Sequence, residues 1–299
     1  MMCYLRNLMC LSVLIALLLA APAFSAYTFE GGNAISHEVG GEEISVSDWS
    51  EVSSGDELYI GHDAWGKLTG DGGSGTVYNT YVGYNGEGEM VLAGSSTDFT
   101  NDNDFAVGAF DSGELSVSNG ASLLVRAGLQ VGLESQGIMT VDGGDVNGGG
   151  GIIMNNSDSA DADGSSLTIT GGGTVDAYSL SHYNNSSSMT IEDGTADFVD
   201  GYGIVVYGGT FTINVGLSGS LKLGQFYHND MESFLGFIDA QNDSTINLNL
   251  WDGSDYVDYS ALTEDVDYQV NGGELTIVPE PATMALLGLG GLFVRRRRT

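Results

Sequence analysis

Short stretches in which apolar and polar residues alternate dominate the chain. Examples are Leu115-Ser116-Val117-Ser118, Leu167-Thr168-Ile169-Thr170 and Met189-Thr190-Ile191. Alternation with a period of two is typical of a β-strand with one buried face, here with Leu, Met, Val and Ile inside and Ser or Thr outside. Gly-Gly, Asp-Gly or Asn-Gly pairs, which readily form turns, end many of these stretches. No helical periodicity is visible across the body, so the sequence predicts an all-β protein.

The alternating stretches belong to a repeat. In four copies, from Ile60-Gly61 to Val131-Gly132, an apolar residue and a glycine are followed, seven residues after the glycine, by Leu or Met. Later copies keep only the strand. The anchor positions are separated by 22, 25, 24, 28, 22 and 22 residues, and they are Leu68, Met90, Leu115, Met139, Leu167, Met189 and Phe211. A repeat of this length indicates one supersecondary unit per copy, stacked on its neighbours.

A parallel β-helix, or solenoid, with coils of roughly 22–25 residues fits this repeat best. We expect about seven to nine coils at a spacing of ~4.8 Å, with the seven anchors in one interior column. A β-sandwich with evenly spaced strands is the alternative. The glycine-rich units also weakly resemble those of autotransporter passenger domains, which would imply the same solenoid architecture.

The repeat divides the chain into five regions. Residues 27–58 are predicted to form an N-terminal cap or first coil, 59–220 the repeats, and 221–277 the C-terminal coils and a cap rich in aromatic residues. Residues 1–26 and 278–299 are terminal segments of another kind, for which we expect an N-terminal signal helix and a short C-terminal apolar helix.

The N-terminal segment has the order of a secretory signal peptide. Arg6 precedes an apolar stretch over residues 8–21, and small residues suited to cleavage follow at Ala23, Ser25 and Ala26. We therefore expect export through the Sec machinery. The only two cysteines, Cys3 and Cys10, would leave with this peptide, so the mature chain would have no disulfide.

Charge is strongly one-sided. The region between the terminal segments has only three basic residues, Lys67, Arg126 and Lys222. All 40 acidic residues lie from Glu30 to Glu280, so a chain cut before Glu280 would have 39 acids, 3 bases and a net charge near −36. Such a charge argues against binding nucleic acid or an anionic membrane surface. It suits a soluble surface protein, and it is compatible with binding of divalent cations.

No catalytic motif stands out. The four histidines, His37, His62, His182 and His228, lack metal-ligand spacing, and we expect them to be solvated loop residues. Three scattered bases do not provide the cation cluster that a polysaccharide lyase needs. We therefore expect no cofactor and no enzymatic activity. Calcium is the one ion with some support, because Asp158, Asp161 and Asp163 lie in an oxygen-rich loop. Thr170 stands where an EF-hand would have its glutamate, which weakens that match.

The C-terminal segment has three parts in a fixed order. Pro279, Glu280 and Pro281 come first, an uncharged apolar stretch covers residues 282–294, and an arginine cluster follows, comprising Arg295, Arg296, Arg297 and Arg298. The apolar stretch has 13 residues, against the ~20 of a stable membrane span, so it predicts a weak, temporary anchor, and the arginines would hold that end in the cytoplasm. An ordinary tail anchor is the alternative.

This order of residues resembles the PEP-CTERM sorting domain of bacteria. The resemblance implies processing near Pro279-Glu280-Pro281 by an exosortase, a membrane transpeptidase-like enzyme. It implies transient anchoring in the inner membrane, followed by release to the envelope, the cell surface or an extracellular matrix. The sequence thus predicts an exported, non-enzymatic surface or matrix protein associated with exopolysaccharide. The alternatives are a polysaccharide-active β-helix enzyme, either a lyase or a glycosidase, and an adhesin that binds carbohydrate through the aromatic residues of 226–268.

Overall fold

The structure is a computed structural model, and it describes residues 27–30, 35–39, 42–45, 52–156, 159–199, 201–224, 231–240 and 246–278. In 35–39, 42–45 and 239–240 only the backbone is described. Both predicted terminal helices lie outside these residues, together with the cleavage region at Ala23, Ser25 and Ala26.

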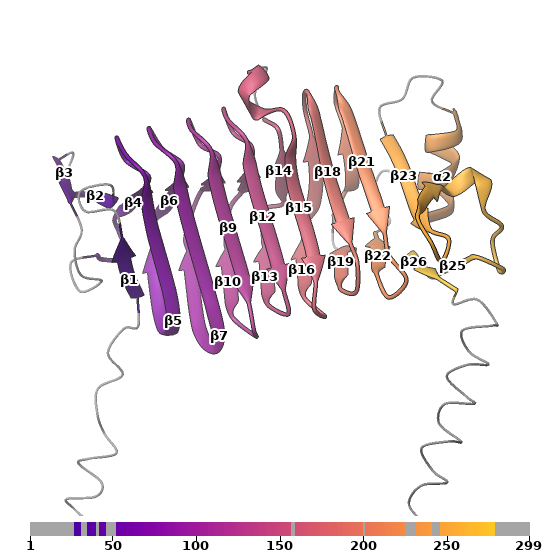
Figure 1. Cartoon of the computed structure of the whole chain (residues 1–299), viewed down its shortest axis with the longest axis horizontal. Helices are drawn as coiled ribbons and strands as arrows, with labels where there is room; N and C mark the ends of the chain where they lie inside the picture. The colour runs from indigo at the N-terminus through magenta and orange to yellow at the C-terminus, as the bar shows by residue number, and fades with distance from the viewer. Residues whose placement is uncertain are drawn as a thin grey trace, which may run out of the picture.

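Figure 1 shows a long row of parallel strands, coil after coil, from the N-terminal to the C-terminal end. Each coil has three faces, and each face pairs with the same face of the next coil. The coil-to-coil pairing is parallel and in register, as in Leu115 with Met139 and Met139 with Leu167. The predicted parallel β-solenoid is therefore confirmed.

The first two faces share two long strands, β5 (Gly66–Val77) and β7 (Gly88–Asn101), which bend from one face to the other. The first face continues through β9 (Gly113–Ser118), β12 (Gly137–Asp142), β15 (Ser165–Thr170), β18 (Ser186–Ile191), β21 (Thr210–Val215) and β23 (Ile246–Trp251). The second continues through β10 (Ser122–Val125), β13 (Asp145–Gly148), β16 (Thr174–Ala177), β19 (Thr195–Phe198) and β22 (Ser220–Leu223).

The third face is a separate sheet of shorter strands. It comprises β4 (Glu57–Ile60), β6 (Asn79–Val82), β8 (Phe105–Val107), β11 (Leu129–Val131), β14 (Ile152–Met154), β17 (Ser179–His182) and β20 (Gly203–Val206). These seven parallel strands set the length of the solenoid at about seven coils. One short 3-10 turn, η3 (Ala160–Ala162), interrupts the corner between β14 and β15.

The interior is a set of apolar columns. On the first face Leu68, Met90, Leu115, Met139, Leu167 and Met189 are partners in successive coils and are 0–2% exposed, as predicted. The prediction is wrong for the seventh residue of the column. Ile213, not Phe211, lies opposite Met189, and Phe211 lies opposite Ser187. Because a two-residue shift leaves both side chains facing inward, the alternation of apolar residues cannot distinguish the two registers.

Both ends of the solenoid are covered by antiparallel strands. At the N-terminal end β1 (Tyr27–Glu30) pairs with β5, and β2 (Ile35–Val39) pairs with β4 and with β3 (Glu42–Ser45). At the C-terminal end β24 (Tyr256–Asp258) pairs with β23, and β26 (Glu274–Ile277) pairs with β22 and with β25 (Tyr268–Asn271). An antiparallel strand breaks the repeating pattern of a parallel stack, so this arrangement protects the edges from further stacking.

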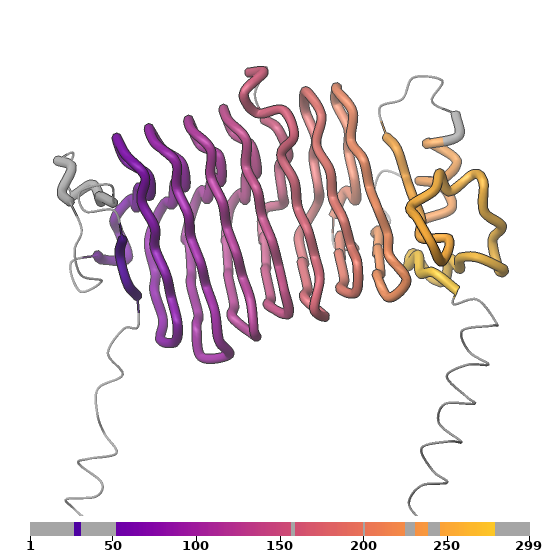
Figure 2. Tube along the Cα trace, viewed as in Figure 1, coloured from indigo at the N-terminus to yellow at the C-terminus, as the bar shows by residue number. Residues whose placement is uncertain are grey.

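The C-terminal cap also contains α2 (Met231–Ala240) and the short η4 (Tyr259–Ala261). Met231 and Phe234 of α2 are fully buried in the continuous apolar core. The Tyr259 hydroxyl donates to the Leu235 carbonyl oxygen at 3.3 Å. Figure 2 shows the cap as a folded-over chain that departs from the regular coil path.

Candidate functional site

A groove of about 260 Å³ crosses four consecutive coils at the start of the first face. Two columns of side chains line it. The last residues of the corner turns form one column, namely Trp65, Glu87, Ser112 and Gln136, and the first outward residues of strands β7, β9 and β12 form the other, namely Glu89, Glu114 and Ile138. The backbone of Gly88 and Gly113 lies between the columns. We call this the Trp65 groove.

The local sequence explains the groove. In each of the four coils the residue between the two columns is glycine, giving the triads Trp65-Gly66-Lys67, Glu87-Gly88-Glu89, Ser112-Gly113-Glu114 and Gln136-Gly137-Ile138. A Cβ on Gly113 would lie 2.3 Å from the Gly108 nitrogen and 2.5 Å from the Val82 carbonyl oxygen. The Gly113 amide donates to the Gln136 carbonyl oxygen at 3.1 Å. The corner is therefore tight, and only glycine fits at the groove floor.

The groove is acidic with an aromatic end. The Lys67 Nζ lies 2.7 Å from Glu89 Oε1, so one carboxylate is neutralised by an ion pair. Within the described part of the chain, Glu87 and Glu114 have no ion-pair partner. Trp65 is 45% exposed, which is high for an indole and leaves its apolar surface available. Hydrogen-bond acceptors beside an exposed aromatic ring can bind hydroxyl-rich ligands such as sugars.

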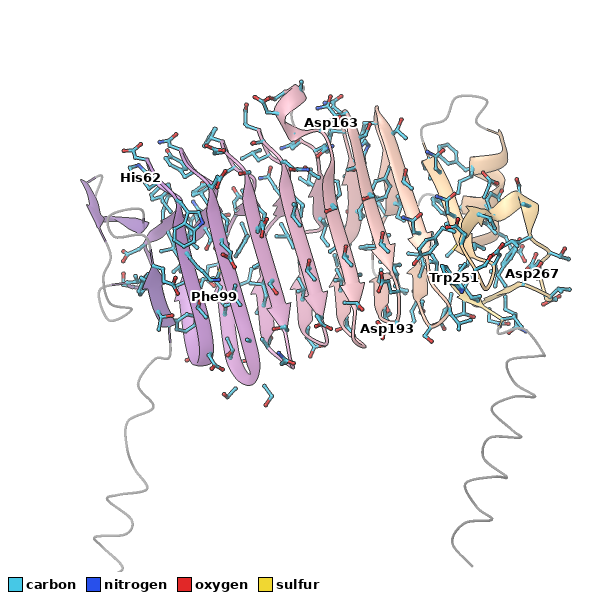
Figure 3. The ribbon with its side chains drawn as sticks, viewed as in Figure 1. His62, Phe99, Asp163, Asp193, Trp251 and Asp267 are labelled. Carbon is cyan, nitrogen blue, oxygen red and sulfur yellow. The ribbon has the colours of Figure 1, made fainter. Side chains whose placement is uncertain are left out.

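A cluster of aromatic residues occupies the adjoining corner between the third and first faces. The Tyr59 and Tyr81 rings stack at 5.4 Å, His62 stacks on Tyr84 at 5.5 Å, and Phe110 meets Tyr84 edge-on at 5.3 Å. Burial, then the charges of Glu57 and Asp104, raise the pKa of Tyr81 to about 12. Phe110 is 52% exposed. This cluster lies in the same coils as the Trp65 groove, and Figure 3 labels His62 at this end of the solenoid.

From β9 onward, the middle outward position of the first-face strands is a hydroxyl or amide residue. This column comprises Ser116, Thr140, Thr168, Thr190, Asn214 and Asn249. Its C-terminal members are linked from coil to coil, because Asn214 Nδ2 donates to Thr190 Oγ1 at 3.2 Å and Asn249 Nδ2 donates to Asn214 Oδ1 at 3.0 Å. The middle of the first face is thus neutral and polar from β9 onward, whereas the start of its N-terminal strands is acidic and aromatic.

The three bases of the body lie on different parts of the solenoid, each beside an acid of a neighbouring coil. Lys67 is on the first face, Arg126 follows β10 and lies 3.2 Å from Asp102, and Lys222 is in β22, 3.8 Å from Asp197. The described part of the chain therefore contains no cluster of cations, which a uronate-cleaving lyase would need.

The structure describes two of the three calcium candidates, Asp161 and Asp163. Asp163 Oδ1 accepts a hydrogen bond from the Ser186 amide of the next coil at 2.8 Å. This carboxylate therefore links the corner that contains η3 to β18. Asp161 is exposed, and Asp158 lies outside the described residues. Among the residues that the structure describes, no group of three His, Cys, Asp or Glu side chains is arranged to hold a metal ion.

Three of the described aromatic residues proposed for an adhesin surface belong to the core. Phe234, Tyr259 and Tyr268 are 0–7% exposed, whereas Trp251 and Tyr256 are partly exposed and contact each other edge-on at 5.4 Å. Phe226 and Tyr227 lie outside the described residues. The buried members cannot contact carbohydrate, and Trp65 and Phe110 are more exposed, at 45% and 52%. The sequence analysis missed the Trp65 groove, and the glycines recurring between polar flanks are the signal that could have indicated it.

The expectation that the histidines are solvated is wrong for His182. Its side chain is fully buried in β17, stacked on Phe211 at 5.3 Å. Burial lowers its pKa to about 4, and the nearby Gly208 backbone offsets part of this effect. Neither ring nitrogen is in hydrogen-bonding geometry within the described structure. His62 belongs to the aromatic cluster, the side chain of His37 is not described, and His228 lies outside the described residues.

The last described residue, Val278, connects the cap to the C-terminal segment. Its amide donates to the Asp267 carbonyl oxygen at 2.9 Å, directly after β26. Val278 also lines a second cavity of about 580 Å³ with Leu217, Trp251 and Asp267, and Figure 3 labels the last two toward the C-terminal end of the solenoid. The sorting residues Pro279, Glu280 and Pro281 and the cluster Arg295, Arg296, Arg297 and Arg298 follow, outside the described residues.

The chain is thus a β-solenoid whose cap ends where the C-terminal segment begins. A family model described as the PEP-CTERM protein-sorting motif matches residues 278–298. The resemblance seen in the sequence is therefore confirmed: the protein carries a PEP-CTERM sorting motif, is exported, is anchored through its C-terminus before processing, and is sorted by an exosortase-type enzyme. No curated protein and no solved structure matches the chain. No helix among the described residues is long and apolar enough to cross a membrane.

Proposed function

We propose that the solenoid is a non-enzymatic surface or matrix protein that associates with exopolysaccharide after it is sorted. The observation that carries this proposal is the Trp65 groove, an exposed indole beside carboxylate, amide and hydroxyl groups on a rigid sheet. The sorting motif supports it, because it delivers the solenoid to the outside of the cell. The signal peptide over residues 1–26 would supply the first step, through the Sec machinery.

A rigid rod with a large negative charge suits this role. The solenoid core is continuous from Tyr27 to Ile277, so the rod needs no disulfide to keep its shape. Its outward columns of Ser, Thr and Asn are neutral hydrogen-bonding groups at a regular spacing of ~4.8 Å from coil to coil. Such a surface can make many weak contacts with a polymer at once, which raises the overall binding strength.

Sorting is tested by removing the C-terminal segment. The full chain and a chain truncated after Val278 are expressed in a host with an exosortase, and the cell envelope, surface and medium fractions are compared. We expect the full chain to pass through the inner membrane and reach the surface, and the truncated chain to remain unanchored in the periplasm. Identical fractionation of the two chains would contradict the role of residues 279–299.

A glycosidase is the second candidate, because three carboxylates and Lys67 gather at the Trp65 groove. Glycosidases need a pair of carboxyl groups across a bound sugar. Release of reducing ends from a soluble polysaccharide by the purified protein, abolished by Glu114→Gln, would favour the enzyme. Absence of new reducing ends under conditions where the polysaccharide binds would favour the non-enzymatic role.

A further inference from the structure

We infer that the Trp65 groove binds a single chain of a neutral polysaccharide, laid along the solenoid axis. This inference rests on the proposed function and deepens it, because it gives the site and the chemical class of the ligand. The groove is defined by the two columns that meet at the first face, and its long direction runs from coil to coil.

The dimensions of the groove fit a polymer better than a single small sugar. It crosses four coils, from Trp65 through Glu87 and Ser112 to Gln136. At ~4.8 Å per coil, three steps span about 14 Å, which is longer than one sugar ring.

The chemistry of the lining fits hydroxyl groups. Glu87, Glu114 and the side chains of Ser112 and Gln136 provide acceptors, and sugar hydroxyls are the matching donors. Hydrogen bonds to a charged acceptor are stronger than hydrogen bonds between neutral groups. Trp65 adds an apolar platform and an indole N–H donor at the end of this row. The combination of one aromatic surface with several fixed polar groups is the usual composition of a specific ligand site.

The negative charge of the groove favours neutral polysaccharides over acidic ones. Glu87, Glu89 and Glu114 face the groove, the only base beside it is Lys67 within the described structure, and Lys67 is already paired with Glu89. A uronate chain would bring further carboxylates to this surface and would be repelled, in addition to the repulsion from the whole body. A neutral chain avoids this cost and still uses the carboxylates as acceptors.

The site is confined to the N-terminal coils by the sequence. In the next two coils the corresponding triads are Gly164-Ser165-Ser166 and Ser186-Ser187-Ser188. The corner before Gly164 is also longer and contains η3. Neither triad has a carboxylate or an aromatic residue. The structure therefore provides its own comparison region on the same face.

Binding is measured by affinity gel electrophoresis and calorimetry on processed protein recovered from the surface. The polymers are a neutral β-glucan, a uronate polymer and an amino-sugar polymer. Trp65→Ala is compared with Tyr207→Ala, which removes a 64% exposed aromatic side chain from the C-terminal half. Thermal unfolding of each variant checks that the exposed substitutions leave the fold intact.

We expect binding to the neutral polymer, a loss of about tenfold or more in Trp65→Ala, and little change in Tyr207→Ala. The double variant Glu87→Gln with Glu114→Gln should tolerate the uronate polymer better than the natural protein. If Trp65→Ala binds as well as Tyr207→Ala, the groove is not the site, although the proposed function stands. Binding only to a charged polymer would overturn the neutral class, and binding to none of the three would overturn the proposed function as well.

Discussion

The first four coils and the later coils turn the corner from the third face to the first in different ways. In the N-terminal coils two glycines five residues apart form the corner, such as Gly108 with Gly113. The next corner begins with Asn155, which adopts the same left-handed conformation with a φ of 48°, and runs through η3. The last two corners use Tyr183 and Tyr207, whose rings stack at 4.6 Å.

This difference shows that the same stack of paired strands can be connected by two kinds of corner. The glycine corners are held largely by backbone hydrogen bonds, for example Gly108 N–H to Val82 O at 2.9 Å. The later corners use side chains, for example Asn155 Nδ2 to the Ser186 carbonyl oxygen at 2.9 Å. In the glycine corners the flanking residues line up from coil to coil as two columns, and this arrangement forms the Trp65 groove in the N-terminal coils.

The largest effect should come from adding a Cβ to a glycine corner. Gly108 has a φ of 72°, and a Cβ there would lie 2.5 Å from the Gln136 backbone. We expect Gly108→Ala to lower the free energy of unfolding by about 3–4 kcal/mol, since it combines conformational strain with a clash against backbone.

Gly172→Ala is the matched control for this substitution. Its φ of 76° is similar, but nothing lies within 4 Å of the added Cβ. The conformational cost alone is about 1–2 kcal/mol. Denaturant unfolding of both variants separates the cost of backbone strain from the cost of the steric clash. Equal losses in the free energy of unfolding would mean that the close packing of neighbouring corners does not affect stability.

The next effect concerns His182 and pH. Its pKa in the folded protein is about 4, below the ordinary value of 6.5, so the unfolded chain binds more protons between these values. Neutral His182 therefore contributes to the free energy of unfolding fully above pH 6.5. This free energy decreases by roughly 3 kcal/mol as the pH falls toward 4.

Comparing the natural protein with His182→Leu isolates this group from the many surface carboxylates, which titrate in both. We expect the free energy of unfolding of the variant to fall less between pH 7 and pH 4. It should also be at least as stable at pH 7, because the substitution removes a buried ring without hydrogen-bonded nitrogens. Parallel pH profiles of the two proteins would show that His182 is not buried as described.

The smallest effect should come from Asn155, at the first corner of the C-terminal kind. Asn155→Gly keeps the left-handed backbone conformation and loses the side-chain bond to Ser186, at a cost of about 1 kcal/mol. Asn155→Ala loses both, and we expect about 1 kcal/mol more. Thermal unfolding should therefore rank the natural protein above Asn155→Gly and Asn155→Gly above Asn155→Ala. The reverse order of the two variants would show that backbone conformation is not what Asn155 provides.

The repeat made the solenoid and six of the seven residues of its first interior column predictable. Phe211 was misplaced because its strand, Phe-Thr-Ile, presents an apolar residue inward in either register, and the preceding corner sets the choice. His182 was missed because Ser179-Leu180-Ser181-His182 has only one large apolar residue, and burial of the last position follows from its pairing with Met154.

The groove could not be predicted from the alternation, because alternation describes which residues face inward. It depends on which outward residues of successive coils become neighbours, and that requires the register of every corner. The sorting segment is the opposite case. Its chemistry is carried by adjacent residues from Pro279 to Arg298, so the sequence alone was sufficient to find it, and the family match covers the same residues.

The most direct test of the account is the intact mass of the protein recovered from the surface of exosortase-positive cells. The account predicts a chain that lacks the signal peptide over residues 1–26 and has lost the arginine cluster after cleavage near Pro279-Glu280-Pro281. Its mass would then correspond to the β-solenoid and its cap, with any group that the enzyme attaches at the new end. A surface protein whose mass still includes Arg295 to Arg298 would contradict it.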